Sequence, residues 1–251
     1  MRISANLGFL FREFELPEAI RAAKRQGFDA VEMHWPYETD ASAVAAALAE
    51  TGLPLLGVNT ARGDVAAGDF GLSALPERQA EARAAIDQAV AWSVVTGCRN
   101  IHVMAGRSAG ERAFQAFTDN LRYAVEKASP HGIGILIEPL NPRDAPGYFL
   151  ADLPTALRVI EATDGAVRVM YDCYHMQIVH GDLLRTVEQH LDAIGHIQFA
   201  AVPDRAEPDH GEVNFGWLLP AFASAGYSGF FGAEYKQLSG SFAWLGDYGE
   251  R

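Results

Sequence analysis

The stretch Ile137-Glu138-Pro139-Leu140-Asn141 decides the fold, because it shows how the buried segments of this chain end. An apolar run over residues 133–137 stops at the carboxylate of Glu138, and Pro139 prevents the segment from continuing as a strand. Short, nearly continuous apolar runs are typical of parallel strands that are buried on both faces. The stretch therefore predicts a buried strand that presents a carboxylate at its carboxyl end.

Three later apolar runs end in the same way, each at one residue with a side-chain oxygen: residues 167–171 at Asp172, 194–197 at Gln198, and 230–233 at Glu234. A single polar residue at a strand end can simply hydrogen-bond its own loop. Four such residues at the same position in successive units favour a shared site. Because the carboxyl ends of parallel strands meet at one edge, we expect the four side chains to converge.

Apolar segments alternate with helical patterns along the whole chain of 251 residues. The expected strands are 3–7, 30–33, 54–58, 99–104, 133–138, 167–172, 194–198 and 230–234. The expected helices are 16–26, 40–50, 76–96, 111–128, 153–162, 182–191 and 215–225. This alternation predicts an α/β fold, a single-domain (β/α)8 TIM barrel over residues 1–251. An open doubly wound sheet is disfavoured, because no GxGxxG turn follows the first strand and there is no P-loop.

Two connections interrupt the regular alternation. The loops over residues 60–74 and 199–211 are long for a compact domain, and long loops often bind ligands or form lids. A short aromatic tail, Phe242-Ala243-Trp244, is expected to pack on the barrel or on a partner, so a homo-oligomer is compatible with the sequence.

The overall charge restricts the partners. The formal net charge is −12, from 20 Lys and Arg against 32 Asp and Glu, and an acidic protein repels phosphate backbones. We therefore expect no nucleic-acid partner. No apolar run approaches the roughly 20 residues of a membrane span, and no signal peptide is evident. Cys98 and Cys173 cannot form a disulfide framework, so we expect a cytoplasmic protein with reduced thiols and no membrane contact.

The convergent oxygens predict a metal site. Three carboxylates packed together without a cation repel one another and raise at least one pKa, and a divalent ion removes that cost. A set of three carboxylates and one amide carbonyl consists of hard oxygen ligands. Such ligands favour Mg²⁺ or Mn²⁺ over Zn²⁺.

The sequence resembles the hydroxypyruvate isomerase and 2-oxotetronate isomerase family, within the xylose isomerase-like TIM barrels. The resemblance covers nearly the whole chain. It is carried by six stretches: FDAVE at 28–32 followed by WPY at 35–37, GDVAAG at 63–68, IEPLN at 137–141, YDCYHMQ at 171–177, HIQ at 196–198 and EYK at 234–236.

The resemblance implies a function and assigns roles. It implies a metal held by Glu138, Asp172, Gln198 and Glu234, with Glu138 and Glu234 as the catalytic proton-transferring pair. The implied reaction is isomerisation of a small hydroxy-oxo acid, either hydroxypyruvate to tartronate semialdehyde or a 2-oxotetronate. One glutamate would remove a proton and the other return it to the adjacent carbon, through an enediolate that the ion stabilises.

Four further residues are predicted to bind the substrate. His175, just after the sixth strand, could hydrogen-bond a substrate oxygen, as the family implies. Arg205 could pair bidentately with a substrate carboxylate, and Lys236 could serve the same need. Asn59, at the end of the third strand, could also touch the substrate. We expect structural roles for the remaining polar residues of the strands: Glu32, His34, His102 and His196.

Two alternatives stay open. The first is another enzyme of the same barrel type, a ketose 3-epimerase or a polyol dehydratase; Gln198 in place of a histidine argues against the epimerase. The second, from a different class, is a non-catalytic barrel that binds sugar acids. That reading predicts the loss of one of the two glutamates, whereas Glu138 and Glu234 are both present.

Overall fold

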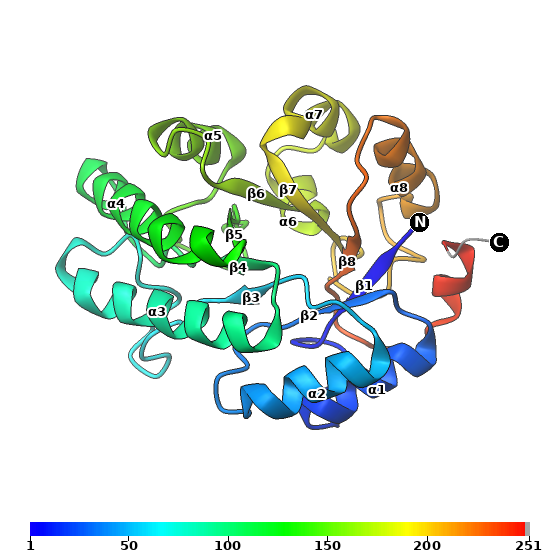
Figure 1. Cartoon of the computed structure of the whole chain (residues 1–251). Helices are drawn as coiled ribbons and strands as arrows, with labels where there is room; N and C mark the ends of the chain where they lie inside the picture. The colour runs from blue at the N-terminus through cyan, green and yellow to red at the C-terminus, as the bar shows by residue number, and fades with distance from the viewer. Residues whose placement is uncertain (249–251) are drawn as a thin grey trace.

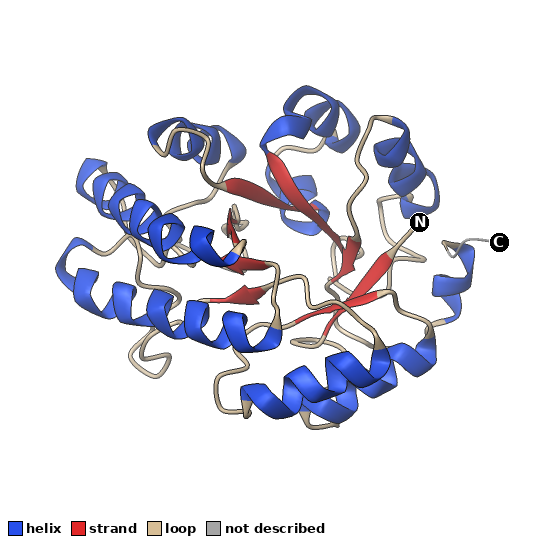
Figure 2. Ribbon diagram, in the orientation of Figure 1, coloured by secondary structure: helices blue, strands red, loops and turns tan. Residues whose placement is uncertain are grey.

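The strands lie at the centre of the molecule and the helices surround them, as Figures 1 and 2 show for the computed structural model, which describes residues 1–248. The strands are β1 (Ile3–Asn6), β2 (Ala30–Glu32), β3 (Val58–Asn59), β4 (Asn100–His102), β5 (Gly134–Ile137), β6 (Arg168–Asp172), β7 (Ile194–Phe199) and β8 (Phe231–Ala233). The α-helices are α1 (Leu16–Gln26), α2 (Ala41–Thr51), α3 (Gln79–Thr96), α4 (Glu111–Ala128), α5 (Leu153–Ala162), α6 (Cys173–Val179), α7 (Leu183–His190) and α8 (Phe215–Ser224). The short 3-10 helices are η1 (Pro76–Arg78), η2 (Ser129–His131), η3 (Leu191–Ala193) and η4 (Ala243–Asp247).

All paired strands are parallel, in the order β2-β1-β8-β7-β6-β5-β4-β3. Val31 of β2 also forms a parallel bridge with Leu55, in the segment that leads into β3. There the Val31 amide donates to the Pro54 carbonyl at 3.0 Å, and Leu56 donates back to Val31 at 2.9 Å. The barrel is thus closed, and the predicted (β/α)8 fold is confirmed.

Local sequence explains where the helices begin and end. The Asp40 carboxylate accepts a hydrogen bond from the Ser42 amide at the start of α2. Pro17 occupies the first turn of α1, where its missing N–H costs nothing. Gly27 follows α1 with φ +95°, a left-handed conformation that suits glycine.

Several elements differ from the expectation: the expected strand 99–104 is β4 (Asn100–His102), and the expected helix 76–96 begins with η1 before α3. Helix α6 was not predicted, because residues 173–179 make only a short helix between β6 and α7. The Asp172 carboxylate caps it by accepting a hydrogen bond from the Tyr174 amide at 2.9 Å. The expected strand 54–58 is also shorter, because its first residues make only the isolated bridge at Leu55.

The aromatic tail packs on the barrel. Phe242 stacks on Phe11 with ring centroids 4.9 Å apart, and Trp244 donates its indole N–H to the Tyr235 hydroxyl at 3.0 Å. The Met1 amino group donates to the Tyr248 carbonyl at 3.1 Å, which places the two ends of the described chain side by side. Of the two expectations for this tail, packing on the barrel is confirmed. Within residues 1–248, no helix is long and apolar enough to cross a membrane.

The two long loops lie over the carboxyl ends of the strands. The loop after β3 is fastened by an ion pair between Asp69 and Arg78 at 2.6 Å and by a bridge between Gly71 and Ala105. In the loop after β7, Arg205 adopts φ +57° and accepts a backbone hydrogen bond from Lys236 at 2.7 Å. Both loops therefore have fixed backbone contacts near the mouth of the barrel.

Candidate active site

The four predicted strand-end residues lie at neighbouring strand ends. Asp172 and Gln198 belong to β6 and β7, while Glu138 and Glu234 directly follow β5 and β8. All four are buried. The Gln198 amide nitrogen donates to Glu234 at 2.5 Å. The Arg205 guanidinium spans Asp172 and Glu234, with contacts of 3.3 and 2.7 Å. The expected convergence is thus seen directly for three of the four residues.

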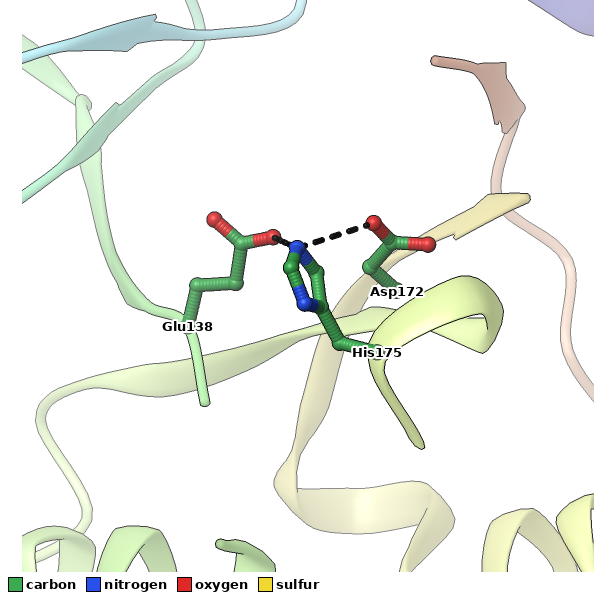
Figure 3. Close-up of side chains that lie close together, drawn as sticks. All are labelled: Glu138, Asp172 and His175. Atoms are coloured by element: carbon green, nitrogen blue, oxygen red, sulfur yellow. Dashed lines mark ion pairs between the residues drawn. The ribbon is translucent and has the colours of Figure 1, made fainter. Parts of the chain in front are cut away.

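Glu138 joins the others through His175 (Figure 3). The imidazole Nε2 lies 3.9 Å from a Glu138 oxygen and 3.6 Å from an Asp172 oxygen. The potential ligand atoms of these three residues all lie within 4.8 Å of one another. Glu138, Asp172 and His175 therefore face one small volume.

The hydrogen bonding of His175 makes it a donor toward this volume. The Asn141 backbone amide donates to Nδ1 at 3.0 Å, so the ring proton resides on Nε2. Burial lowers the pKa of His175 to about 3, so the ring is neutral at physiological pH. A protonated Nε2 cannot ligate a metal. It can donate to a carboxylate or a substrate oxygen, and the predicted contact of His175 with the substrate stays a prediction.

Glu234 is held on both of its oxygens. One accepts hydrogen bonds from Asn6 at 2.8 Å and from Gln198, and the other from Arg205. Burial alone would raise the pKa of Glu234, but the neighbouring His34 and Arg205 outweigh it and lower the pKa to about 2. Glu234 is thus an ionised carboxylate in a fixed orientation.

Glu138 has the opposite environment. Within the described chain its Oε1 has no hydrogen-bond partner, and its Oε2 lies 3.5 Å from His102. Burial, together with the charges of Glu234 and Asp172, raises the pKa of Glu138 well above its usual value. The two glutamates of one cavity therefore have contrasting surroundings, a feature typical of acid–base sites.

A second layer of hydrogen bonds orients Gln198. Its amide nitrogen donates to Glu32 at 2.8 Å as well as to Glu234, so its Oε1 must point elsewhere. Glu32 also accepts from His196 at 2.9 Å. Gly232 leaves room for this cluster, because a Cβ there would lie 2.5 Å from the Glu32 carboxylate. The structural roles expected for Glu32 and His196 match these contacts.

The residues present fit a divalent cation. Two buried acceptors, Glu138 Oε1 and Gln198 Oε1, lack a hydrogen-bond partner anywhere in residues 1–248. Buried oxygens of this kind are costly unless something positive meets them. The guanidinium of Arg205 compensates only part of the charge of Glu138, Asp172 and Glu234. This donor set, rather than one that includes His175 Nε2, suits a hard metal ion.

A cavity of about 380 Å³ opens over these residues. Its wall on the side of β5 to β8 includes Glu138, His175, Arg205 and Glu234. The lining from the segments after β2 and β3 includes His34, Trp35, Asn59 and Arg62, and of these His34 lies 3.6 Å from Glu234. The volume of this cavity suits a small molecule.

Of the other three residues predicted to bind the substrate, Asn59 and Arg205 line the cavity and Lys236 does not. Asn59 lines the cavity, where its Oδ1 lies 3.3 Å from His102. Arg205 lines it too, but its guanidinium is already engaged by two carboxylates. Lys236 is exposed and lies outside the cavity lining. Its contact to the site is through its backbone amide, which supports Arg205.

Sequence reasoning missed three residues of this site. Asn6 ends β1 after an apolar run, so the pattern that identified Glu138 could have found it. Trp35 and Arg62 lie in loops, where no periodic pattern indicates which side chains face the cavity.

Glu207 anchors the loop that carries Arg205. Its buried carboxylate accepts backbone hydrogen bonds from Leu238 at 2.9 Å and Ser239 at 2.7 Å, and another from the Ser239 hydroxyl at 2.8 Å. Burial raises the pKa of Glu207, but these hydrogen bonds outweigh it and leave the pKa below its usual value. The ionised carboxylate thus ties the loop after β7 to the segment after β8.

The fold and the site together define a class of protein. The xylose isomerase-like TIM barrel family matches residues 20–248 of this chain. The chain belongs to this family.

Relatives with named activities indicate which type of enzyme in this family the chain is similar to. The 2-oxo-tetronate isomerase of Cupriavidus necator is 40% identical over 250 residues, covering 98% of this chain and 96% of that protein. The hydroxypyruvate isomerase of Escherichia coli is 34% identical over 241 residues, covering 94% and 93%. A crystal structure described as an AP endonuclease, family 2, from Brucella melitensis superposes with a TM-score of 0.95 at 38% identity, covering 99% of each chain. The predicted family and the predicted type of enzyme, an isomerase, are confirmed by these matches to named isomerases.

The Glu207 anchor generates a pH-dependent prediction. Because its pKa is depressed in the folded state, its contribution to stability is present above the unfolded value of about 4.3 and is lost as pH falls through the folded value. Glu207→Gln should therefore lower the free energy of unfolding at pH 7 by about 1–3 kcal/mol, measured by urea denaturation. The difference from wild type should shrink below about pH 4.

Glu212→Gln is the matched control, since Glu212 is an exposed carboxylate near the same loop. It should change stability by less than about 0.5 kcal/mol. A Glu207→Gln protein as stable as wild type at pH 7 would contradict the anchoring role.

Proposed function

We propose that this isomerase acts on a small hydroxy-oxo acid of the hydroxypyruvate or 2-oxotetronate type. The observation that carries the proposal is the pair Glu138 and Glu234, two buried glutamates that line one small cavity from β5 and β8. The names of the relatives support this substrate class. The reaction moves a hydrogen between adjacent carbons, which requires a base on one carbon and an acid on the other.

The two glutamates divide the proton transfer. One carboxylate removes the proton from the hydroxyl-bearing carbon and leaves an enediolate. The other glutamate returns a proton to the neighbouring carbon, while the hydroxyl proton passes from the oxygen that becomes the carbonyl to the oxygen that becomes the hydroxyl. The reverse reaction exchanges the roles of the two glutamates. Asn6, Gln198 and Arg205 hold Glu234 in a fixed orientation, so the substrate need not order this side chain.

Oxygen atoms of the substrate gain negative charge during this transfer, and the site offers positive groups to meet them. The His175 Nε2–H and the Arg205 guanidinium both face the cavity. Fixed donors in a water-poor pocket stabilise such charge strongly. A divalent ion bound at this site would polarise the carbonyl and stabilise the same developing charge.

We further propose Glu138, Asp172, Gln198 and Glu234 as the residues that hold this ion, with Mg²⁺ or Mn²⁺ as the metal. The unpartnered oxygens of Glu138 and Gln198 support this assignment. So does the all-oxygen chemistry of the set.

The proton-transfer roles predict a large loss of activity. Glu138→Gln and Glu234→Gln each keep the size and shape of the side chain but remove its basicity. Each should lower turnover of hydroxypyruvate or a 2-oxotetronate by about 10²–10⁴-fold, followed by proton NMR, with an unchanged circular dichroism spectrum.

Glu161→Gln, on the exposed face of α5, should retain wild-type turnover. Free ketoses assayed in parallel separate the isomerase from an epimerase of the same barrel type. Wild-type turnover in either cavity variant would exclude these roles for the pair.

The metal assignment predicts a change in affinity. Asp172→Asn keeps the cap of α6, because asparagine caps as well as aspartate, but it removes a charged ligand. After treatment with a chelator, the variant should bind Mn²⁺ at least about 10-fold more weakly than wild type by calorimetry or by electron paramagnetic resonance.

Asp192→Asn, at an exposed position in η3, should bind Mn²⁺ as wild type does. Equal Mn²⁺ affinity in wild type and Asp172→Asn would remove Asp172 from the ligand set.

A further inference from the structure

We propose that Arg62, held against Trp35, binds the carboxylate of the hydroxy-oxo acid on the side of the cavity opposite the proton-transferring pair. The inference rests on the proposed function and deepens it by assigning the group that recognises an acid. Binding of the substrate carboxylate is thus assigned to Arg62 rather than to Arg205, for which the sequence had suggested this role.

The position of Arg62 is fixed by an aromatic platform. Its guanidinium carbon lies 3.7 Å from the centroid of the Trp35 ring, and the Trp35 indole donates to the Thr60 carbonyl at 3.1 Å. Tyr37 donates its hydroxyl to the Asn59 carbonyl at 2.5 Å, which ties the loop after β2 to the end of β3. A guanidinium stacked on an aromatic face keeps its N–H edge available for a planar carboxylate.

Arg62 also has unused hydrogen-bonding capacity. Among the described residues, its side chain takes part in no hydrogen bond or ion pair, although it is half-buried and lines the cavity. Loss of water around it lowers the pKa of Arg62, and the guanidinium stays charged at neutral pH. A partly desolvated arginine without an acidic partner gains strongly from an incoming carboxylate.

Arg205 is in the opposite situation. Its guanidinium contacts the carboxylates of Asp172 and Glu234 and lies between two aromatic rings, 5.0 Å from Phe9 and 4.9 Å from Tyr174. A substrate carboxylate placed there would meet two negative groups. Binding an acid through Arg205 would therefore have to break contacts that orient Glu234.

The order of the strands indicates how an acidic substrate is oriented in the cavity. In a closed barrel of eight strands, β2 and β3 face β6 and β7. Arg62 follows β3, whereas Glu138 and Glu234 follow β5 and β8. An acid bound to Arg62 places its carboxylate on the side of β2 and β3, and its other carbons extend toward the side of β5 to β8. Arg12, which also lines the cavity, adds a further positive charge to it.

Glycerate and glycerol test the subsite independently of turnover. Glycerate carries the carboxylate but has no carbonyl to isomerise, and glycerol lacks the carboxylate. Calorimetry should show that Arg62→Met binds glycerate about 10- to 100-fold more weakly than wild type, with no change for glycerol. Arg62→Lys should recover part of the loss, because it keeps the charge but not the fork. In turnover of hydroxypyruvate, the loss should fall mainly on KM.

Arg83→Met is the matched control, because Arg83 makes a similar contact, 4.7 Å from the Tyr123 ring on the outer helices. It should bind glycerate as wild type does. Unchanged glycerate affinity in Arg62→Met, or no glycerate binding by wild type, would overturn the subsite. If wild type isomerises no hydroxy-oxo acid but glycerate binding still depends on Arg62, the proposed function fails and the carboxylate subsite stands.

Discussion

The hydrogen bond from Gln198 to Glu234, buried inside the barrel, is the contact on which the site depends. The same amide nitrogen donates to Glu32, and Asn6 reaches the same carboxylate oxygen as Gln198 does. These contacts connect β1, β2, β7 and the end of β8. The closed barrel thus supplies a rigid frame for Glu234, and the chemistry requires little rearrangement of protein groups.

The second constraint is negative charge. Glu138, Asp172 and Glu234 are buried around one volume, and Arg205 compensates part of their charge. This imbalance explains both the expected divalent ion and the need for a separate place for an acidic substrate. Arg62, the residue proposed to bind that acid, lines the same cavity from the segment after β3. In the proposed arrangement, Arg62 recognises the acid while Glu138 and Glu234 act on the reacting carbons.

Much of this could be predicted from the sequence, for a physical reason. Strands buried on both faces leave a continuous apolar run, so the polar residue that ends each run is conspicuous, as at Glu138 and Glu234. Loop residues follow no periodic pattern, so the sequence did not indicate that Arg62 faces the cavity. Arg205 was predicted to bind a substrate carboxylate because the sequence does not reveal its contacts with Asp172 and Glu234. Helix α6 was missed because seven residues are too few for a helical pattern. The roles of the site residues remain predictions.

Transfer of a proton between carbons by Glu138 and Glu234 is the central claim, and isotope incorporation tests it most directly. Hydroxypyruvate would be isomerised in D2O and the tartronate semialdehyde examined by NMR at low conversion. Proton transfer through an enediolate predicts one solvent deuterium on the carbon that becomes hydroxyl-bearing, because carboxyl protons exchange with solvent. A product without deuterium at that carbon would contradict proton transfer between two carboxyl groups that exchange with solvent.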